Sequence, residues 1–315
     1  MMKKVALITG IRGQDGSYLA DLLKAKSFDV VGISRTESGV YRSARLEAID
    51  LTDIDAVASI IKKFNPQQIY HLADESFVNQ DLPHRSDLLV NSYKMIHNLL
   101  EGIKLYSPKC RFFYAGSIQS FGKTTESPQK EDSLQNPDTI YGLCKFNGSQ
   151  LTKMYREKEG MFSCVGYLSN HESPLRGPSF FTRKVVNGIL DILENKKKYI
   201  ELGNIKGLRD WSDARDVVQA MSQMLEASQP TDYMIGSGKL QTTQYVIDTL
   251  FEVAELEKKD YIKINSELIR KERSITLAPD VSRIKSELGW EAMTPLRQTL
   301  RDMFEKEKEL RNFSA

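Results

Sequence analysis

The 315-residue chain is 40% hydrophobic and 27% charged, which predicts a globular protein of one large or two modest domains with a substantial core. Its 44 basic and 42 acidic residues leave a formal net charge of +2, which disfavours nucleic acid and anionic membranes as partners. No run approaches the roughly 20 apolar residues of a membrane span, and the Met-Met-Lys-Lys start leads into a strand pattern instead of an export signal, so we expect a cytoplasmic protein.

The first half of the chain alternates short apolar runs with longer segments of helical period. This alternation predicts an α/β fold, a Rossmann-type doubly wound parallel sheet with helices on both faces. Helices are expected just after Gly16 and over residues 56–63, where apolar side chains recur on one face. The clearest strands are residues 4–9, 29–34, 68–73, 111–117 and 162–168.

From residue 168 the regular alternation weakens, which indicates a boundary between two domains. We expect a Rossmann domain over residues 1–167 and a smaller α/β domain mainly over residues 168–315. Part of about 210–250 should return to the first sheet, because a strand pattern at 233–237 precedes a capped helix. The closing segment, 295–313, predicts an amphipathic helix.

The three cysteines are Cys110, Cys144 and Cys164, widely spaced and without a Cys-x-x-Cys pair. That odd number and spacing support neither a disulfide framework nor a zinc site. We therefore expect buried thiols and no bound metal.

Gly10, Gly13 and Gly16 follow the first predicted strand and open the first helix. Missing side chains let the backbone turn tightly and approach a pyrophosphate, whose charge then lies at a helix N-terminus. An ordinary glycine turn is the alternative, but the strand–turn–helix context favours a dinucleotide site. The expected cofactor is NAD(H) or NADP(H), with Gln14 and Asp15 among its contacts.

Arg35 and Glu37 end the second strand, about 20 residues beyond the last glycine, where the adenosine ribose would lie. Glu37 favours NAD and Arg35 favours NADP, with a slight preference for NAD, although either could be a solvated loop residue. Asp50 is placed to reach the adenine edge or to cap a helix near Asp53. Further predicted cofactor contacts are Leu51, Leu72 and Ala73.

Tyr141 and Lys145 lie four residues apart, hence on one face of a helix. A neighbouring ammonium stabilises a phenolate, which brings a phenol that titrates near 10 closer to use as a base. With 13 tyrosines, chance alone gives about one such pair, so its position matters: the pair follows the strand that ends at Ser117. Ser117 is then expected to hold a reacting hydroxyl while Tyr141 takes its proton and a nicotinamide takes its hydride.

Five segments, in order along the chain, resemble the GDP-mannose 4,6-dehydratase family of extended short-chain dehydrogenases: GQDGSYLA (13–20), YGLCK (141–145), NHESPLRG (170–177), FTRK (181–184) and RDW (209–211). The resemblance implies a GDP-sugar substrate held mainly by the second domain. Arginine and lysine suit a buried diphosphate, which needs several cations to replace its water. The substrate-binding residues that the resemblance implies are Ser76, Gln119, Asn170, Arg176, Lys184, Asn204, Arg209 and Arg270.

The chain departs from the resembled family beside Ser117. Family members carry Thr-Ser-Glu where this chain has Ser117, Ile118 and Gln119, and they use that glutamate to remove the C5 proton after oxidation at C4. Glutamine cannot accept that proton, so elimination should be lost while hydride transfer remains. Asp74 and Glu75 replace an uncharged pair, and either supply a carboxylate near the nicotinamide or face solvent.

These residues predict an NAD(P)-dependent oxidoreductase acting at C4 of a GDP-mannose or GDP-manno-heptose type sugar, in surface polysaccharide biosynthesis. It would form or reduce a 4-keto sugar without loss of water, as a homodimer joined through two helices. A GDP-mannose 4,6-dehydratase using Asp74 or Glu75 as base and a GDP-4-keto-6-deoxy-sugar reductase stay open. So does a cofactor-sensing regulatory partner, although Tyr141 and Lys145 argue against it.

Overall fold

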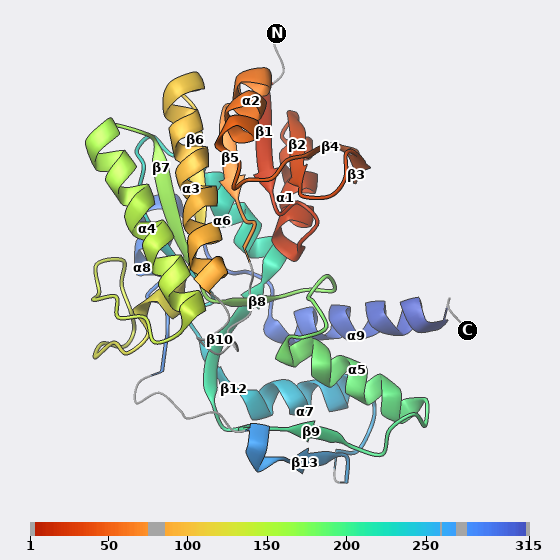
Figure 1. Ribbon diagram of the computed structural model, residues 1–315. Helices are drawn as coiled ribbons and strands as arrows, with labels where there is room; N and C mark the ends of the chain where they lie inside the picture. The colour runs from red at the N-terminus through yellow and green to blue at the C-terminus, as the bar shows by residue number, and fades with distance from the viewer. Residues whose placement is uncertain (1–3, 75–85, 259, 269–275, 313–315) are drawn as a thin grey trace.

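The computed structural model describes residues 4–74, 86–258, 260–268 and 276–312, and an eight-stranded sheet dominates it (Figure 1). The strand order is β11-β7-β6-β5-β1-β2-β4-β3, and every pairing is parallel except that of β3 with β4. The predicted doubly wound α/β fold is confirmed. The strands are β1 (Lys4–Thr9), β2 (Phe28–Ser34), β3 (Gly39–Tyr41), β4 (Ala44–Ala48), β5 (Gln68–His71), β6 (Arg111–Ser117), β7 (Ser163–Leu168) and β11 (Tyr233–Ile235).

Helices cover both faces of this sheet and enclose a separate apolar core on each. On one face, α1 and α6 bury residues such as Leu19 and Met221, while Val57 and Leu99 are buried under α2 and α3 on the other. These helices are α1 (Gln14–Ala25), α6 (Ala214–Glu226), α2 (Ile54–Phe64), α3 (Ser86–Tyr106) and α4 (Ile140–Glu159). Because both faces are covered, the carboxyl ends of the strands are the edge open to a ligand.

A smaller α/β part lies below the carboxyl ends of these strands in Figure 1. A third apolar core lies in this part, where α5, α7 and α9 pack around residues such as Val186, Leu250 and Leu300. Two short sheets, β12-β10-β8 and β13-β9, complete it. Its elements are β8 (Asn170–Glu172), α5 (Phe181–Leu193), β9 (Ile200–Leu202), β10 (Leu208–Asp213), β12 (Leu240–Thr242), α7 (Thr243–Val253), β13 (Ile262–Ile264) and α9 (Leu296–Asn312).

The chain returns to the large sheet after β10, as the pattern at 233–237 predicted. Strand β11 pairs with β7, with Tyr233 opposite Gly166, and Thr242 caps the following α7 by accepting a hydrogen bond from the Tyr245 N–H. Helix α8 (Ser282–Leu288) also packs against β11. The second half of the chain therefore contributes to both parts of the molecule.

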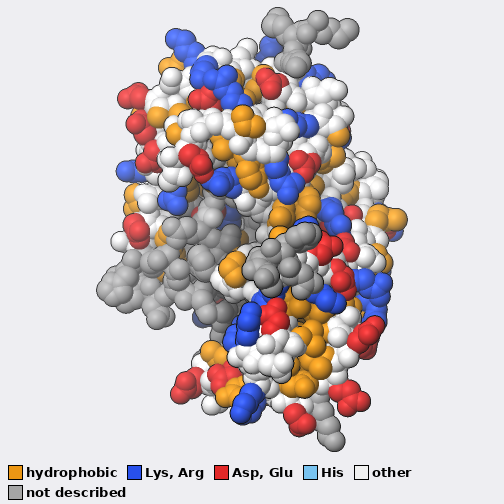
Figure 2. Space-filling view, turned by 90° about the vertical axis from the view of Figure 1, so that its right-hand side faces the viewer, with side chains coloured by type: hydrophobic (Ala, Val, Ile, Leu, Met, Phe, Trp, Pro, Cys, Tyr) orange, Lys and Arg blue, Asp and Glu red, His pale blue; other side chains and the backbone are white. Residues whose placement is uncertain are grey.

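The described surface carries charged side chains of both signs. Lysine and arginine are interspersed with aspartate and glutamate over the face turned to the viewer in Figure 2. Within the described ranges, no helix combines the length and apolar character needed to cross a bilayer. The three cysteines are buried as predicted, and burial raises the pKa of each thiol, that of Cys144 to about 11.

Candidate active site

The glycine loop between β1 and α1 forms a tight backbone cradle. Gly10 has a φ of +70°, and a Cβ there would lie 2.9 Å from the Ala73 nitrogen. A Cβ on Gly16 would lie 2.5 Å from Ile11 Cα, so the turn needs glycine at both positions. Gly13 is the N-cap of α1 and has no side chain to cap the first-turn N–H groups. The loop can therefore present these N–H groups to a phosphate.

The side chains of Gln14 and Asp15 point toward the NHES segment. Asp15 Oδ2 lies 2.9 Å from His171 Nε2, and Gln14 Nε2 donates to the His171 carbonyl at 3.1 Å. Ser173 Oγ donates to Gln14 Oε1 at 2.8 Å. These two predicted cofactor-binding residues thus link the glycine loop to β8, which leaves their backbone amides for a cofactor.

Opposite charges hold this link together. Burial disfavours the imidazolium, but the Asp15 carboxylate outweighs burial and raises the pKa of His171 above its ordinary value. Burial likewise disfavours the carboxylate, but His171 outweighs it and lowers the pKa of Asp15. Each residue therefore favours the charged form of the other, and His171 Nδ1 also lies 2.8 Å from the Ser169 carbonyl oxygen.

Replacement of His171 by glutamine should remove stability in a pH-dependent way. Because the folded-state pKa of His171 is raised, the charged pair stabilises the fold fully below about pH 6.5, as long as Asp15 stays ionised, and less as pH rises through the folded-state value of His171. We expect a loss of about 3 kcal/mol in the free energy of unfolding below about pH 6.5, shrinking at alkaline pH. Urea unfolding of the unaltered protein and of His171→Gln, at pH values below and above about 6.5, measures this loss. A difference in the free energy of unfolding that does not depend on pH would contradict the charged pair.

Ser117, Tyr141 and Lys145 come from neighbouring elements at the carboxyl end of β6. Ser117 ends β6 and accepts a hydrogen bond from the Gln119 N–H at 3.2 Å, at the start of the 3-10 helix η2 (Ile118–Phe121). Lys145 Nζ lies 5.7 Å from the Tyr141 ring centroid and donates to the Ala115 carbonyl of β6 at 2.8 Å. Lys145 is buried and Tyr141 is partly exposed. The arrangement places a phenol beside a cation where a ligand can reach it.

Asp74 reaches the same lysine. Its Oδ2 lies 2.9 Å from Lys145 Nζ, and the two side chains are 11% and 6% exposed. Burial disfavours the ammonium, but Asp74 outweighs it and the pKa of Lys145 is raised. Of the two alternatives open for Asp74, the structure places it inside the site and not toward solvent. The sequence offered no sign of this ion pair, since the two residues lie on separate elements.

Gln119 contributes an unsatisfied polar atom to this region. Its Oε1 is buried and has no hydrogen-bond partner among the described residues. A Cβ on Gly142 would lie 2.6 Å from the Gln119 carbonyl, which shows how closely η2 packs on the first turn of α4. Buried acceptors normally have a donor, so this amide oxygen fits a ligand hydroxyl, in keeping with the predicted substrate contact.

The predicted adenosine end lies after β2 and β4. Arg35 and Glu37 are both exposed, and Glu37 forms an ion pair with Arg12. Asp50 accepts hydrogen bonds from the Thr52 N–H and hydroxyl, and these bonds lower its pKa. Asp53, not Asp50, is the N-cap of α2. Three further predicted cofactor contacts already have partners within the protein. Leu51 is buried in the core, and the N–H groups of Leu72 and Ala73 donate to Thr9 Oγ1.

The predicted substrate residues Asn170 and Arg176 flank the NHES segment. Asn170 Nδ2 donates to the Asp210 carbonyl at 3.2 Å, since β8 pairs with β10. The Arg176 guanidinium lies 3.5 Å from the Phe180 ring centroid, and its Nε lies 3.2 Å from Glu172 Oε2. Asn170 is therefore positioned by strand β10, and Arg176 by residues close to it in the sequence.

The other predicted substrate residues are spread over three elements or lie outside the described residues. Lys184 is exposed on α5, and Asn204 accepts a hydrogen bond from the Lys206 N–H in the loop before β10. Arg209 is exposed on β10 and donates to the Leu208 carbonyl. These three residues all belong to the smaller part of the molecule. Ser76 and Arg270 lie outside the described residues, as does Glu75.

Arg183 is a residue that the pattern did not single out. It is 8% exposed and donates to the carbonyls of Pro174 and Arg176, while pairing with Glu307 of α9. It therefore anchors the loop that carries Arg176. Its place beside Lys184 in the FTRK segment is the feature of the sequence that could have pointed to it.

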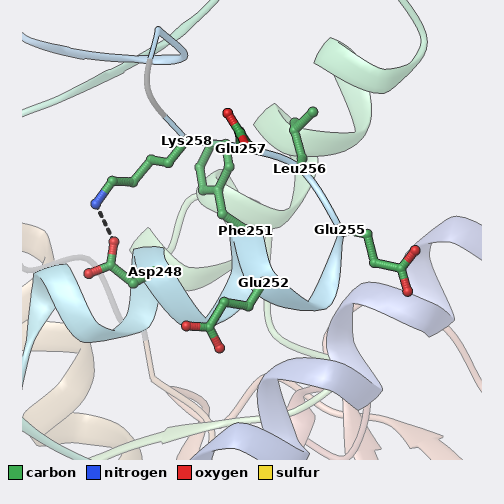
Figure 3. A pocket seen from close by; sticks show the side chains of 7 residues that line it. All are labelled: Asp248, Phe251, Glu252, Glu255, Leu256, Glu257 and Lys258. Atoms are coloured by element: carbon green, nitrogen blue, oxygen red, sulfur yellow. Dashed lines mark hydrogen bonds and ion pairs between the residues drawn. The ribbon is translucent and has the colours of Figure 1, made fainter.

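A separate hollow of about 480 Å³ lies at the end of α7 (Figure 3). Four acidic side chains line it, and its Lys258 pairs with Asp248. Clustered carboxylates repel a diphosphate, and α7 lies in the smaller part of the molecule, away from the glycine loop (Figure 1). This hollow is therefore not the site built by the residues above. Its lining residues are Asp248, Phe251, Glu252, Glu255, Leu256, Glu257 and Lys258.

Comparisons with known proteins bear on the family and the fold. Residues 7–303 match a family described as GDP-mannose 4,6 dehydratase. GDP-mannose 4,6 dehydratase 2 of Caenorhabditis elegans is 32% identical over 339 residues, covering 96% of this chain and 88% of that protein. Pseudomonas aeruginosa RMD complexed with NADPH has a TM-score of 0.83 at 21% identity, covering 98% and 99% of the two chains. Bacillus anthracis dTDP-glucose 4,6-dehydratase in complex with NAD has a TM-score of 0.85 at 19% identity, covering 98% of each.

Proposed function

The chain belongs to the GDP-mannose 4,6 dehydratase family of nucleotide-sugar enzymes, and from this premise we propose that it transfers hydride at C4 of a GDP-linked sugar. The observation that supports this most is the grouping of Ser117, Tyr141 and Lys145 at the carboxyl end of β6. Open α/β sheets bind their ligands at that edge. The substrate would be of the GDP-mannose or GDP-manno-heptose type, and the product or reactant a 4-keto sugar.

The cofactor proposed is NAD(H) or NADP(H), and the glycine loop fits it. The cradle around Gly10 and Gly16 has no room for a Cβ, so the backbone is free to approach a pyrophosphate. Arg35 is exposed at the adenosine end, whereas Glu37 forms an ion pair with Arg12. This difference favours NADP(H), whose 2′-phosphate an arginine can bind, more strongly than the sequence alone did. Bound there, the nicotinamide supplies the hydride chemistry.

The chain's own residues supply orientation and proton transfer. Tyr141 Oη takes the proton of the C4 hydroxyl during oxidation, or gives one to the C4 oxygen during reduction. Ser117 Oγ would form a hydrogen bond with that oxygen. Lys145, one turn away on the same helix, places a positive charge near the Tyr141 phenol. Gln119 Oε1 is suited to accept a hydrogen bond from a sugar hydroxyl.

Dehydration is proposed to be absent. Gln119 cannot act as a base toward a C5 proton. Asp74 is the carboxylate among the described residues that could take over from the missing glutamate, but it forms an ion pair with Lys145 at 2.9 Å. We further propose that residues 1–167 mainly hold the cofactor and residues 168–315 mainly the GDP-sugar, with cations such as Arg176 and Arg209 toward the diphosphate.

A homodimer through α3 and α4 is proposed as the assembled form. These helices pack side by side on one face of the sheet (Figure 1). Each carries exposed apolar side chains at helical spacing: Val90 and Tyr93 on α3, and Leu143 and Met154 on α4. Apolar residues spaced in this way suit a second copy of the same two helices.

The experiment that tests hydride transfer follows the absorbance of reduced nicotinamide. Purified protein is incubated with GDP-mannose or GDP-manno-heptose and either NAD or NADP. A substrate-dependent rise in absorbance is expected with one of the two sugars. No change with either sugar or cofactor at neutral and alkaline pH, together with no loss of reduced nicotinamide when a 4-keto GDP-sugar is supplied, would contradict the proposed activity.

A further inference from the structure

Lys145 is held between three elements of the large sheet's open edge. Its Nζ donates to the Ala115 carbonyl of β6 at 2.8 Å and lies 2.9 Å from Asp74 Oδ2, directly after β5. The Tyr141 ring is one turn away on α4, with its centroid 5.7 Å from the same nitrogen. The cation that would assist Tyr141 therefore already has a carboxylate as its nearest charged neighbour among these groups.

The other titratable groups facing Lys145 are uncharged at neutral pH. Burial and then Lys145 lower the pKa of His71 on β5 to about 3. Burial raises the pKa of Tyr114 on β6, whose ring centroid lies 5.3 Å from Nζ, and raises that of Cys144 on α4 to about 11. Asp74 is thus the one group in this set that compensates the ammonium charge.

We propose that Asp74 is a positioning residue that compensates the charge of Lys145 and thereby weakens the support that this ammonium gives to a Tyr141 phenolate. A lone ammonium at this distance stabilises a phenolate. A carboxylate bound to that ammonium turns the charge into a short dipole, whose field at Tyr141 is much weaker than that of a single charge.

Tyr141 gives up its proton in reduction but must already have lost it to accept one in oxidation, so weaker support for the phenolate favours reduction of a 4-keto sugar. This inference rests on the proposed function and adds a direction to it. In that step the C4 carbon receives a hydride from the reduced nicotinamide, which is thereby oxidised. The C4 oxygen takes the electron pair of the broken carbonyl π bond and the proton from Tyr141 Oη. The phenolate left behind recovers its proton from water, and oxidation becomes faster only as pH rises and the phenol ionises.

The direct test measures the ionisation of Tyr141 without cofactor or substrate. Ultraviolet titration of tyrosinate is compared between each protein and its Tyr141→Phe counterpart, so that the difference reports Tyr141 alone. Asp74→Asn keeps the shape and removes the charge, and it should move the Tyr141 midpoint down by at least about one pH unit. An unchanged or higher midpoint, including one caused by loss of the Lys145 proton, would overturn the proposal.

Two further variants guard this test. Asp74→Ser is smaller and neutral, and should lower the midpoint as Asp74→Asn does if the amide variant fails to fold. Asp29→Asn removes an exposed carboxylate on β2, outside the described site, and should leave the midpoint where it is in the unaltered protein. A shift of equal size with Asp29→Asn would show that the effect is not local to Lys145.

A second readout separates this proposal from the proposed function. In the oxidation direction, the pH at which hydride transfer reaches half its maximum should fall in Asp74→Asn by the same interval as the tyrosinate midpoint. If the unaltered protein oxidises no GDP-sugar and reduces no 4-keto form, the proposed function fails while the tyrosinate titration still decides the role of Asp74. A lowered midpoint with an unmoved rate profile would overturn the link to catalysis.

Discussion

Tyr141→Phe is expected to reduce hydride transfer by about 10²- to 10⁴-fold while the protein keeps its affinity for the cofactor. The substitution removes only the Oη atom, so the ring still packs beside Lys145 and the glycine loop is untouched. What is lost is the proton acceptor or donor at the C4 oxygen. Single-turnover absorbance of the nicotinamide measures the rate, and a fluorescence titration measures cofactor binding.

The matched control for this variant is Tyr155→Phe on the same helix. Tyr155 is buried and donates its hydroxyl to Glu101 of α3, far along α4 from the site. Its loss should lower stability by about 1 kcal/mol, the value of a typical hydrogen bond, without changing the rate. A Tyr141→Phe protein as active as Tyr155→Phe would remove Tyr141 from the proton transfer.

Gly16→Ala is expected to weaken cofactor binding by about 10- to 100-fold and to destabilise the fold by about 1–3 kcal/mol. The added methyl group would overlap the Gly10 carbonyl and lie 2.5 Å from Ile11 Cα, so the loop must open. An opened loop no longer holds its N–H groups in one cradle. Cofactor titration and urea unfolding measure the two effects.

Gly207→Ala is the control for the glycine loop. A Cβ at Gly207 would lie 3.5 Å from its nearest neighbour, Arg209 Nη1, which is ordinary contact. Cofactor affinity and stability should both be close to those of the unaltered protein. If Gly16→Ala bound the cofactor equally well, the cradle would not be the pyrophosphate site.

The large sheet was predictable because its strands are strongly apolar and separated by helices. The predicted bounds of β1 and β6 agree with the structure, and those of β2 and β7 differ by one residue at one end. Three-residue strands such as β8 and β9 were not predicted, since so short a run has no measurable period. Their formation depends on pairing with distant strands, which a local pattern does not contain.

The candidate site was likewise predictable only in part. Tyr141 and Lys145 were found by their spacing within one helix, and Ser117 by its place at a strand end. The pair of Asp15 with His171 joins residues 156 positions apart, and Asp74 reaches Lys145 of α4 from the segment after β5, so neither pair could be predicted from local spacing. The departure from the resembled family drew attention to Asp74, but only the fold showed that Lys145 is its partner.

Hydride transfer without dehydration is measured most directly by the mass of the product formed from GDP-mannose and GDP-manno-heptose with NAD, with NADP and without added cofactor. We predict a product lighter than its substrate by two hydrogens, formed at neutral or alkaline pH, because hydride and proton leave C4 while water is retained. A product lighter by one water would contradict this prediction, since elimination would then proceed without a glutamate at position 119.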